Sequence, residues 1–508
     1  MTSKQPALPT LGRRSVPGTS ATAAPAPPPG IVHLGFGNFH RAHQAVYTDA
    51  AVRAHGGDWG IVGVANRSRH VVDAVRAQDN LYTVMTIAPD GAECHVPGVH
   101  TDTVVAAEDA GRVVAQIAAA HTRIITLTVT EHGYTFSPST GGIDMDDPLV
   151  QHDLSTPADP RTTIGQIVRG LQARMHGTDV GISVLSCDNL AGNGDRSRRI
   201  VTDFIDHLPA AEARDLQDWV AARVTFPNSM VDRIVPATTH AHRDQVAHLT
   251  GYRDAVPVPA EPFTMWVIED EFAAGRPQWE AGGATFSTEV ELYEQMKLRL
   301  LNGTHSLIAY LGALGGCATI PESVARAPIA EAAHRVLTGE YLPTLRLPSQ
   351  VSAVEYEQAL FHRWSNTALG HRTSQVGSDG SVKLPQRVCA PALQALDQGV
   401  MPQYLALSVA AYLACVAPVG GFDPGVHARA MSDPVRPRLA ALAAESGTGG
   451  ELARAVFARA RIFPDDLSAR TDFVDRVGEY LQIITTAGAA AAAGEAAHSH
   501  QPTPAPCS

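Results

Sequence analysis

The first apolar run of the chain, IVHLGFG at residues 31–37, ends in Gly35-x-Gly37 and leads into the helical pattern HRAHQAVYTDAAVRA. A glycine pair at a strand-to-helix turn lets the backbone approach a pyrophosphate, which then lies over the helix N-terminus. The third glycine of the usual fingerprint is replaced by His40. On its own, this loop fits a dinucleotide site and a plain strand-to-helix turn equally well.

The segments that follow alternate between short β-branched runs and helical patterns, which is typical of βαβ units around a parallel sheet. Two of the runs are almost continuously apolar, as strands buried on both faces are. From about residue 290, Ala- and Leu-rich helical patterns dominate. We therefore predict an α/β protein in which a Rossmann-type, doubly wound domain precedes a mostly α-helical domain. The segments of the first domain include WGIVGVA (59–65), SRHVVDAVRAQ (68–78), RIITLTVTE (123–131) and DVGISVLSCDN (179–189).

Composition sets the predicted domain limits. Both ends of the chain are low in complexity, so residues 1–29 and 488–508 are predicted to be disordered tails. Pro and Gly cluster in RPQWEAGGATF, which indicates a boundary near residue 285. The dinucleotide-binding domain is then 30–285, and the helical substrate domain is 286–487.

Charge and cysteine usage exclude several classes of partner. The formal charge of −12 gives no general attraction to nucleic acid or to anionic membranes. No stretch reaches the roughly 20 apolar residues that a membrane span requires. The six cysteines are widely scattered, without a C-x-x-C spacing, so we expect reduced thiols and a cytoplasmic protein.

The predicted second strand bears on the choice of cofactor. An acidic residue at its end would normally bind the ribose 2′-hydroxyl of NAD, but the sequence there is Asn66-Arg67-Ser68-Arg69. The two arginines favour a 2′-phosphate or are plain surface charges, so NADP stays open beside NAD. His40 and His43 share a helical face, but they have no acidic or cysteine partners nearby, and we predict no metal site.

The stretch KLRLLNGTHS (297–306) places polar residues at the head of an apolar run. If 291–314 is an α-helix of about 100° per residue, Asn302 lies roughly 140° and His305 roughly 80° from Lys297, on one face. Apolar surroundings lower the pKa of a lysine toward the range of a general base. An amide beside it stabilises an alkoxide, and a histidine binds a neighbouring hydroxyl. The same face also fits a polar seam between two domains.

Four segments together resemble the long-chain mannitol dehydrogenase family of polyol-specific dehydrogenases and reductases. They are GFGNFHRAHQ, FPNSMVDRIVP (226–236), YEQMKLRLLNGTHS (293–306) and DGSVKLPQR (379–387). The resemblance implies an NAD(P)-dependent, zinc-independent enzyme with a Rossmann-type N-terminal domain and a helical C-terminal domain, acting as a monomer. We expect the substrate to bind between the two domains, at the ends of the parallel strands.

The resemblance also implies roles for single residues. Lys297 becomes the general acid/base, Asn302 and Asn193 the pair that stabilises the alkoxide, and His305 a substrate anchor. Asp232 is expected near the nicotinamide end of the cofactor, and Lys383 at the far end of the substrate. The other expected cofactor contacts are Gly35, Phe36, Gly37, Asn38, Thr130 and Glu131.

One departure bears on the substrate. Mannitol-oxidising relatives carry an arginine eight residues before the second lysine, whereas this chain has Gln375. The variant looks more like the fructuronate reductase (mannonate oxidoreductase) branch. A carboxylate or phosphate on the substrate would pair with Lys383 or with a nearby arginine, Arg372 or Arg387, each of which is equally a surface charge.

We therefore predict reversible hydride transfer between NAD(P) and a secondary alcohol of a linear polyol or aldonate, of the mannitol/fructose or mannonate/fructuronate type. Three alternatives stay open. They are a mannitol 1-phosphate dehydrogenase that reduces fructose 6-phosphate, a zinc-dependent dehydrogenase, and a non-catalytic dinucleotide-binding regulator.

Overall fold

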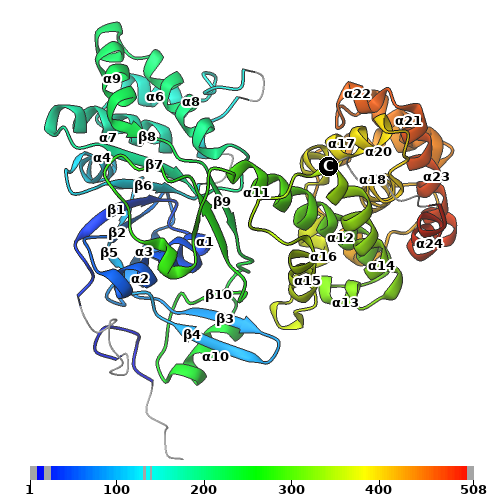
Figure 1. Ribbon diagram of the computed structural model, residues 1–508, viewed down its shortest axis with the longest axis horizontal. Helices are drawn as coiled ribbons and strands as arrows, with labels where there is room; N and C mark the ends of the chain where they lie inside the picture. Colours follow the sequence, from blue (N-terminus) through cyan, green and yellow to red (C-terminus); the bar gives the residue numbers. More distant parts are fainter. Residues whose placement is uncertain (1–7, 16–24, 130–132, 138–139, 500–508) are drawn as a thin grey trace, which may run out of the picture. The chain divides into compact units, whose positions relative to one another are not determined.

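The computed structural model describes residues 8–15, 25–129, 133–137 and 140–499. Packing divides the chain into two units, Met1–Glu291 and Leu292–Ser508 (Figure 1). The predicted boundary near residue 285 lies just before this division. Within the described residues, we find no helix with the length and hydrophobicity that crossing a bilayer requires.

The first unit is built on a parallel sheet of six strands in the order β5-β2-β1-β6-β7-β8. Counted along this sheet, the order is 3-2-1-4-5-6, the doubly wound arrangement that the sequence predicted. The order reverses at β1, which pairs with β2 on one side and with β6 on the other. The strands are β1 (Pro29–Leu34), β2 (Gly60–Ala65), β5 (His100–Val105), β6 (Ile124–Leu127), β7 (Ile182–Ser186) and β8 (Val224–Thr225).

Alternate side chains of these strands enter two separate cores, which explains why the strand sequences are apolar at successive positions. Val32 and Ile125 belong to one core, with residues of α4, α7, α8 and α9. Ile31 and Ile124 belong to the other, with residues of α2 and α3. Figure 1 shows helices on both faces of the sheet. The helices are α2 (Gln44–His55), α3 (Arg69–Arg76), α4 (Ala110–Ala118), α7 (Thr163–Gly177), α8 (Asn193–Asp206) and α9 (Ala210–Arg223).

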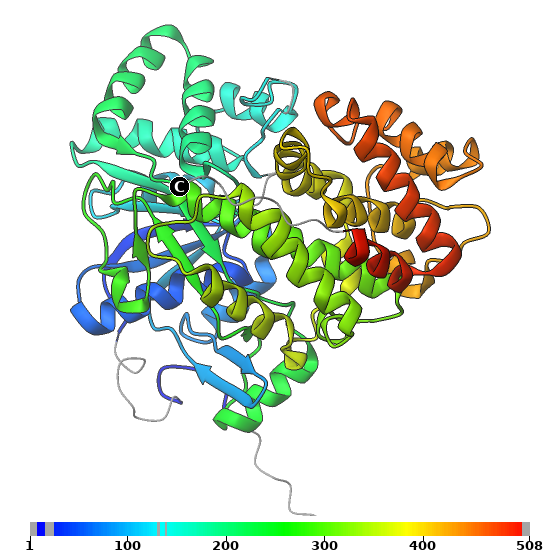
Figure 2. The same ribbon diagram turned by 45° about the vertical axis from the view of Figure 1, so that its right-hand side comes forward.

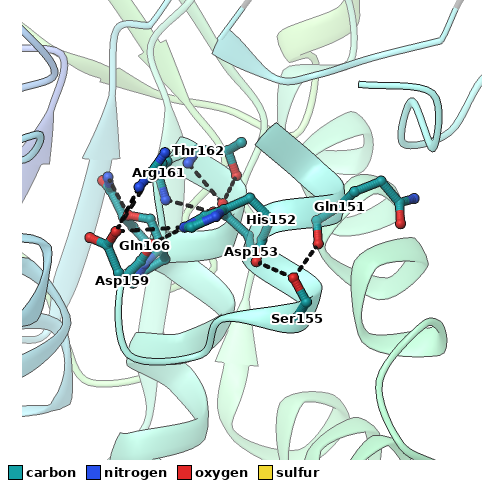
Figure 3. A network of polar contacts seen from close by, with 9 residues as sticks. Gln151, His152, Asp153, Ser155, Asp159, Arg161, Thr162 and Gln166 are labelled. Carbon is teal, nitrogen blue, oxygen red and sulfur yellow. Dashed lines mark hydrogen bonds and ion pairs between the residues drawn. The ribbon is translucent and has the colours of Figure 1, made fainter. Parts of the chain in front are cut away.

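A buried carboxylate fixes the N-terminal end of α7, close to the carboxyl edge of the sheet. Asp153, at 0% exposure, accepts hydrogen bonds from the backbone N–H groups of Arg161 (2.7 Å) and Thr162 (2.8 Å) and from the Thr162 hydroxyl (2.6 Å), as drawn in Figure 3. Thr162 in turn caps α7 by accepting from the N–H of Gly165. These hydrogen bonds therefore hold the first turn of α7 in place.

Two smaller sheets complete the first unit. One pairs β3 (Val84–Ala88) with β4 (Gly91–His95) and β10 (Val258–Ala260). The other pairs β9 (Ser229–Asp232) antiparallel to β11 (Met265–Ile268), with β12 (Thr285–Phe286) beside β11. Trp266 and Trp279 pack against each other in the core behind β11 and are fully buried.

The second unit consists of helices in its described part, as the sequence predicted (Figure 2). Its centre is formed by α12 (Thr304–Leu314) and α18 (Gln403–Val416), which pack against each other and are buried around almost their whole circumference. A helix that is apolar on all sides belongs in the core of a domain. The amphipathic helix α23 (Thr471–Ala487) packs on α18 and covers it.

The prediction of disordered tails is wrong at both ends where the structure describes them. Residues Ala489–Ser499 form helix α24, which packs on α14 (Ala327–Arg335), α18 and α23 and buries Ala492 and Ala496. Alanine has the highest helix propensity, and its small methyl group lets helices approach closely, so low complexity here does not mean disorder. Near the N-terminus, Leu11 is buried and its N–H donates to the carbonyl of Arg253.

Candidate functional site

The glycine loop lies where β1 leaves the sheet. Gly35 has a φ of +102°, and a Cβ at this position would collide with the carbonyl oxygen of Thr128 just beyond β6. Only glycine fits such a backbone against a neighbouring strand end. Gly37 follows as the N-cap of α1 (Asn38–Ala42), and nothing crowds its Cβ position more closely than ordinary van der Waals contact. The loop is therefore a close-packed turn at Gly35 with an open backbone at Gly37.

A pocket of about 80 Å³ opens beside this loop at the carboxyl edge of the sheet. It lies next to β1, where the strand order reverses, which is the place where doubly wound sheets bind ligands. Its volume suits part of a dinucleotide rather than the whole. The pocket is lined by Leu34, Gly35, Val64, Asn66, Val129, Gly133, Thr163 and Gln166.

The other predicted cofactor contacts have different surroundings. Phe36 is buried against Gly63 of β2, and Asn38 accepts a hydrogen bond from Arg41 (2.6 Å). Thr130 and Glu131 lie outside the described residues. At the end of β2, Asn66 lines the pocket, while Arg69 forms exposed ion pairs with Asp73 and Glu108, both at 3.1 Å.

Sequence reasoning missed a cluster of three buried histidines behind the glycine loop. The rings of His33 and His40 stack with centroids 3.3 Å apart, and Nε2 of His40 lies 3.1 Å from Nε2 of His100. His33 also contacts Thr126 (2.8 Å), the Thr128 hydroxyl (3.0 Å) and the Gly35 carbonyl (3.1 Å), so it ties the loop to β6. The available signal was a histidine within the apolar strand IVHLGFG.

The predicted helical pair His40 and His43 is divided between two environments. His43 reaches the carbonyl of Met265 (3.0 Å), away from the histidine cluster. In the described part of the chain, no group of three or more His, Cys, Asp or Glu residues is arranged to hold a metal ion. His40 stacks on His33 and contacts His100, whereas His43 is hydrogen-bonded to the backbone of β11.

Asn193 and Asp232 are both associated with β9 in the first unit: Asn193 is hydrogen-bonded to its first residue, and Asp232 is its last. Asn193 begins α8 at 0% exposure, and its amide donates to the carbonyls of Asp188 (3.1 Å) and Ser229 (2.7 Å) while accepting from the N–H of Ser229 (2.9 Å). The amide thus joins α8 to β9 through Ser229 and to the loop before α8 through Asp188, and a role for Asn193 toward an alkoxide stays a prediction. Asp232 ends β9 and is 5% exposed.

The predicted α-helix over 291–314 is wrong in its central part. The chain forms α11 (Val290–Met296), then a π-helix, η2 (Lys297–Gly303), and then α12. A π turn is closed by i→i+5 hydrogen bonds and winds fewer degrees per residue than an α turn. It therefore brings Lys297 and Asn302, which are five apart, nearer to one face than the roughly 140° separation of an α-helix. Such turns are rare in proteins as a whole, but many of those that occur lie at functional sites.

His305 follows this turn and is surrounded by basic groups. It is 8% exposed, and its Nε2 is buried without a hydrogen-bond partner among the described residues. Its ring meets that of His371 edge to face at 5.0 Å. Burial, reinforced by His371, Arg387, Arg363 and Lys383, holds the pKa of His305 well below its usual range. The ring is therefore neutral, with one unpaired nitrogen.

The predicted residues at the far end of the substrate are only partly brought together. Lys383 is half-buried on α17 (Gly380–Asp397), and its Nζ donates to the Ser378 carbonyl (2.6 Å). Burial, with Arg387 next, lowers the pKa of Lys383. Gln375, on α16 (Thr373–Gly377), and Arg372 are exposed. The neighbouring Arg363 and His371 belong to no sequence motif, so the sequence did not predict them.

The small number of lysines in the chain further supports the helix face that carries Lys297 as part of a candidate site. The chain holds 39 basic residues, of which only Lys4, Lys297 and Lys383 are lysines. Arginine does not lose its proton in proteins, whereas lysine does. Both lysines of the described chain belong to the candidate site, in a protein that otherwise uses arginine. Lys297, at 8% exposure, is of a residue type that can act as a general acid/base.

Comparison with protein families assigns both parts of the chain. The family model described as the mannitol dehydrogenase Rossmann domain matches residues 29–281, and the mannitol dehydrogenase C-terminal domain matches residues 289–485. The D-mannonate oxidoreductase of Escherichia coli is 38% identical over 465 residues, which are 90% of this chain and 94% of that protein. The mannitol 2-dehydrogenase of Cereibacter sphaeroides is 38% identical over 401 residues, covering 78% and 82%.

A solved structure is similar over nearly the whole length. The mannitol 2-dehydrogenase of Pseudomonas fluorescens, in a ternary complex with NAD and D-mannitol, matches with a TM-score of 0.84 and 32% sequence identity. The match covers 97% of this chain and all of that one.

The buried histidines predict a stability that depends on pH. Burial lowers the pKa of His33 and of His100 to about 3, whereas an unfolded histidine titrates near 6.5. Below about pH 6.5 the unfolded chain binds protons that the folded chain excludes, so the free energy of unfolding falls with falling pH. Each group contributes up to about 1.4 kcal/mol per pH unit down to pH 3. Urea unfolding between about pH 7 and pH 5 measures this slope.

The variant His100→Gln provides the control. It removes one of the buried titrating rings, so its stability is expected to depend less steeply on pH than that of the wild type. Equal slopes in the two proteins, or a wild-type stability that is constant over this range, would contradict the assignment of the effect to the cluster.

Proposed function

The chain belongs to the mannitol dehydrogenase family, and we propose that it is a metal-independent, NAD-dependent oxidoreductase that interconverts a linear polyol or aldonate and its 2-keto form, with Lys297 as the general acid/base. One observation carries the proposal. Of the two lysines in the described chain, one begins a buried π turn that also holds Asn302 and leads to His305.

The proposed reaction uses the side chains of this turn in sequence. The Lys297 amine accepts the hydroxyl proton of the substrate, the C–H bond of the same carbon breaks as a hydride, and a C=O bond forms. The loop at Gly35 and Gly37 would hold NAD, whose nicotinamide ring would supply the acceptor for this hydride. Asn302 donates a hydrogen bond to the oxygen while negative charge develops on it. The free Nε2 of His305 binds a neighbouring substrate hydroxyl, which is the partner that this buried nitrogen lacks.

Two observations support NAD as the cofactor. The pocket at the Gly35 loop lies where doubly wound sheets bind dinucleotides, and the similar mannitol 2-dehydrogenase of Pseudomonas fluorescens was solved with NAD. In the first unit, Arg69 is already paired with Asp73 and Glu108, so a 2′-phosphate would have to compete with two carboxylates. NADP is therefore the less favoured cofactor.

The charge around His305 supports an acidic substrate. The pKa of His371 is itself lowered to about 4, and the other groups whose charge most affects this ring are the basic side chains of Arg387, Arg363 and Lys383. A carboxylate at the end of the substrate would offset this charge, whereas a neutral polyol would not. Mannonate and fructuronate are therefore the favoured pair, and the relative named D-mannonate oxidoreductase points the same way.

Replacement of Lys297 tests the catalytic proposal. Lys297→Ala is expected to lower kcat by roughly 10²- to 10⁴-fold, because general acid/base catalysis is lost. Lys297→Arg keeps the positive charge but cannot release its proton, so it should be similarly inactive. Stopped-flow measurement of reduced cofactor formation across a range of pH provides the rates. Turnover that persists in Lys297→Ala at every pH would refute the proposal.

A substrate panel tests the acidic specificity. The pairs are mannitol with fructose, mannonate with fructuronate, and mannitol 1-phosphate with fructose 6-phosphate, each measured with NAD(H) and NADP(H). We expect the highest kcat/KM for mannonate and fructuronate. Lys383→Met should raise the KM of that pair about 10-fold or more, because a charged hydrogen bond is lost, and leave the KM of mannitol nearly unchanged. A preference for mannitol, unaffected by this substitution, would contradict the proposal.

A further inference from the structure

The carbonyl oxygen of Asn302 lies near the end of the π turn and accepts two hydrogen bonds from side chains. One comes from the hydroxyl of Ser306 (3.1 Å), four residues later in the same helical run. The other comes from Nη1 of Arg387 (3.1 Å), which belongs to α17 and lies 85 residues away in the sequence. Side chains that insert into the backbone hydrogen-bond ladder are among the causes of helix irregularities.

Arg387 is held at this carbonyl by its own surroundings. The same Nη1 atom also donates to the hydroxyl of Ser306 (2.7 Å), which is 1% exposed. Burial lowers the pKa of Arg387, and the groups that act against this shift are the buried phenols of Tyr310 and Tyr341. A guanidinium placed in such surroundings is stable only where polar atoms receive its hydrogen bonds. The π turn supplies two of these atoms.

The turn also packs against a second π-helix, η3 (Val336–Tyr341). A Cβ on Gly303, the last residue of η2, would collide with the phenol of Tyr341. Gly303 therefore lets η3 pack directly on the end of the turn. Arg299, within η2, donates to the carbonyl (2.6 Å) and hydroxyl (2.8 Å) of Thr344, just beyond η3. The turn is thus held by contacts with η3 and with the residues just beyond it, within the second unit.

We propose that Arg387 is a positioning residue for Lys297. By donating to the Asn302 carbonyl, Arg387 keeps the segment 297–303 in the π conformation, and this conformation brings the side chains of Lys297 and Asn302 toward one face. Without the guanidinium, this carbonyl loses one of its side-chain partners, and the segment relaxes toward an α-helix, in which the two side chains lie about 140° apart. The inference rests on the proposed role of Lys297.

The experiment compares Arg387→Met with Arg387→Lys. Lysine keeps the charge, but its amine is one bond closer to the backbone than Nη1 and does not reach the carbonyl and the hydroxyl, so the geometry predicts similar losses for both variants. We expect kcat to fall about 10²-fold, as for a misplaced catalytic group. The deficit should narrow as the pH rises, because hydroxide then replaces part of the general-base function. A loss caused by general unfolding would not depend on pH in this way.

A double-mutant cycle identifies the residue through which Arg387 acts. In a Lys297→Ala background, Arg387→Met is expected to lower the remaining activity by less than about threefold, because the group that it positions is already absent. Arg438→Met serves as the matched control, since it removes an arginine of the second unit that donates to a backbone carbonyl, that of Ala460 (2.7 Å), outside the π turn. Its kcat should stay near that of the wild type.

The outcomes separate this inference from the proposed function. Full activity of Lys297→Ala would refute the proposed function itself. Loss of activity in Lys297→Ala together with normal kcat in folded Arg387→Met would refute only the positioning role. Equal losses from Arg387→Met in the wild-type and Lys297→Ala backgrounds would also refute it, because Arg387 would then act independently of Lys297.

Discussion

Strand β1 is hydrogen-bonded to β2 on one side and to β6 on the other, and the loop that leaves it presses Gly35 against the carbonyl oxygen of Thr128. The strand order reverses at this seam between β1 and its two neighbours. The chain connections on the two sides of β1 therefore run in opposite directions and leave space at the strand ends. His33 strengthens the seam through Thr126 and Thr128. The positions of the two cores, of the pocket and of the N-terminal end of α7 all depend on this seam.

Desolvation is the corresponding constraint in the second unit. The apolar helices α12 and α18 exclude water, and the polar groups at the head of α12 lie at the border of this core. The ring of His305 is kept neutral there, while Arg387 is paired with backbone and hydroxyl oxygens. Few charged side chains are stable in such dry surroundings, and those that are present have a defined orientation. This is the setting in which a lysine can exchange a proton with a substrate alcohol.

Local patterns predicted what depends on local physics. Apolar runs such as RIITLTVTE and DVGISVLSCDN indicated the central strands, because strands covered on both faces are apolar at successive positions. The π turn could not be predicted in this way, because the 100° rule assumes an α-helix and a partner of the Asn302 carbonyl lies 85 residues away. His33, His40 and His100 come into contact only when the sheet has formed. The alanine-rich C-terminal segment looked like a tail because two of its partners, α14 and α18, are distant in sequence.

The small number of lysines makes the central claim directly measurable. Because the chain has only three, selective ¹³C labelling of lysine gives few NMR signals, and Lys297→Ala and Lys383→Met assign two of them. A pH titration of the Lys297 signal in the cofactor complex then reports the ionisation of its amine. If Lys297 is the proton acceptor, its measured pKa will equal the pKa that governs the pH dependence of kcat/KM for the substrate at saturating cofactor, within the error of both. A Lys297 signal that titrates at a clearly different pH would contradict the account.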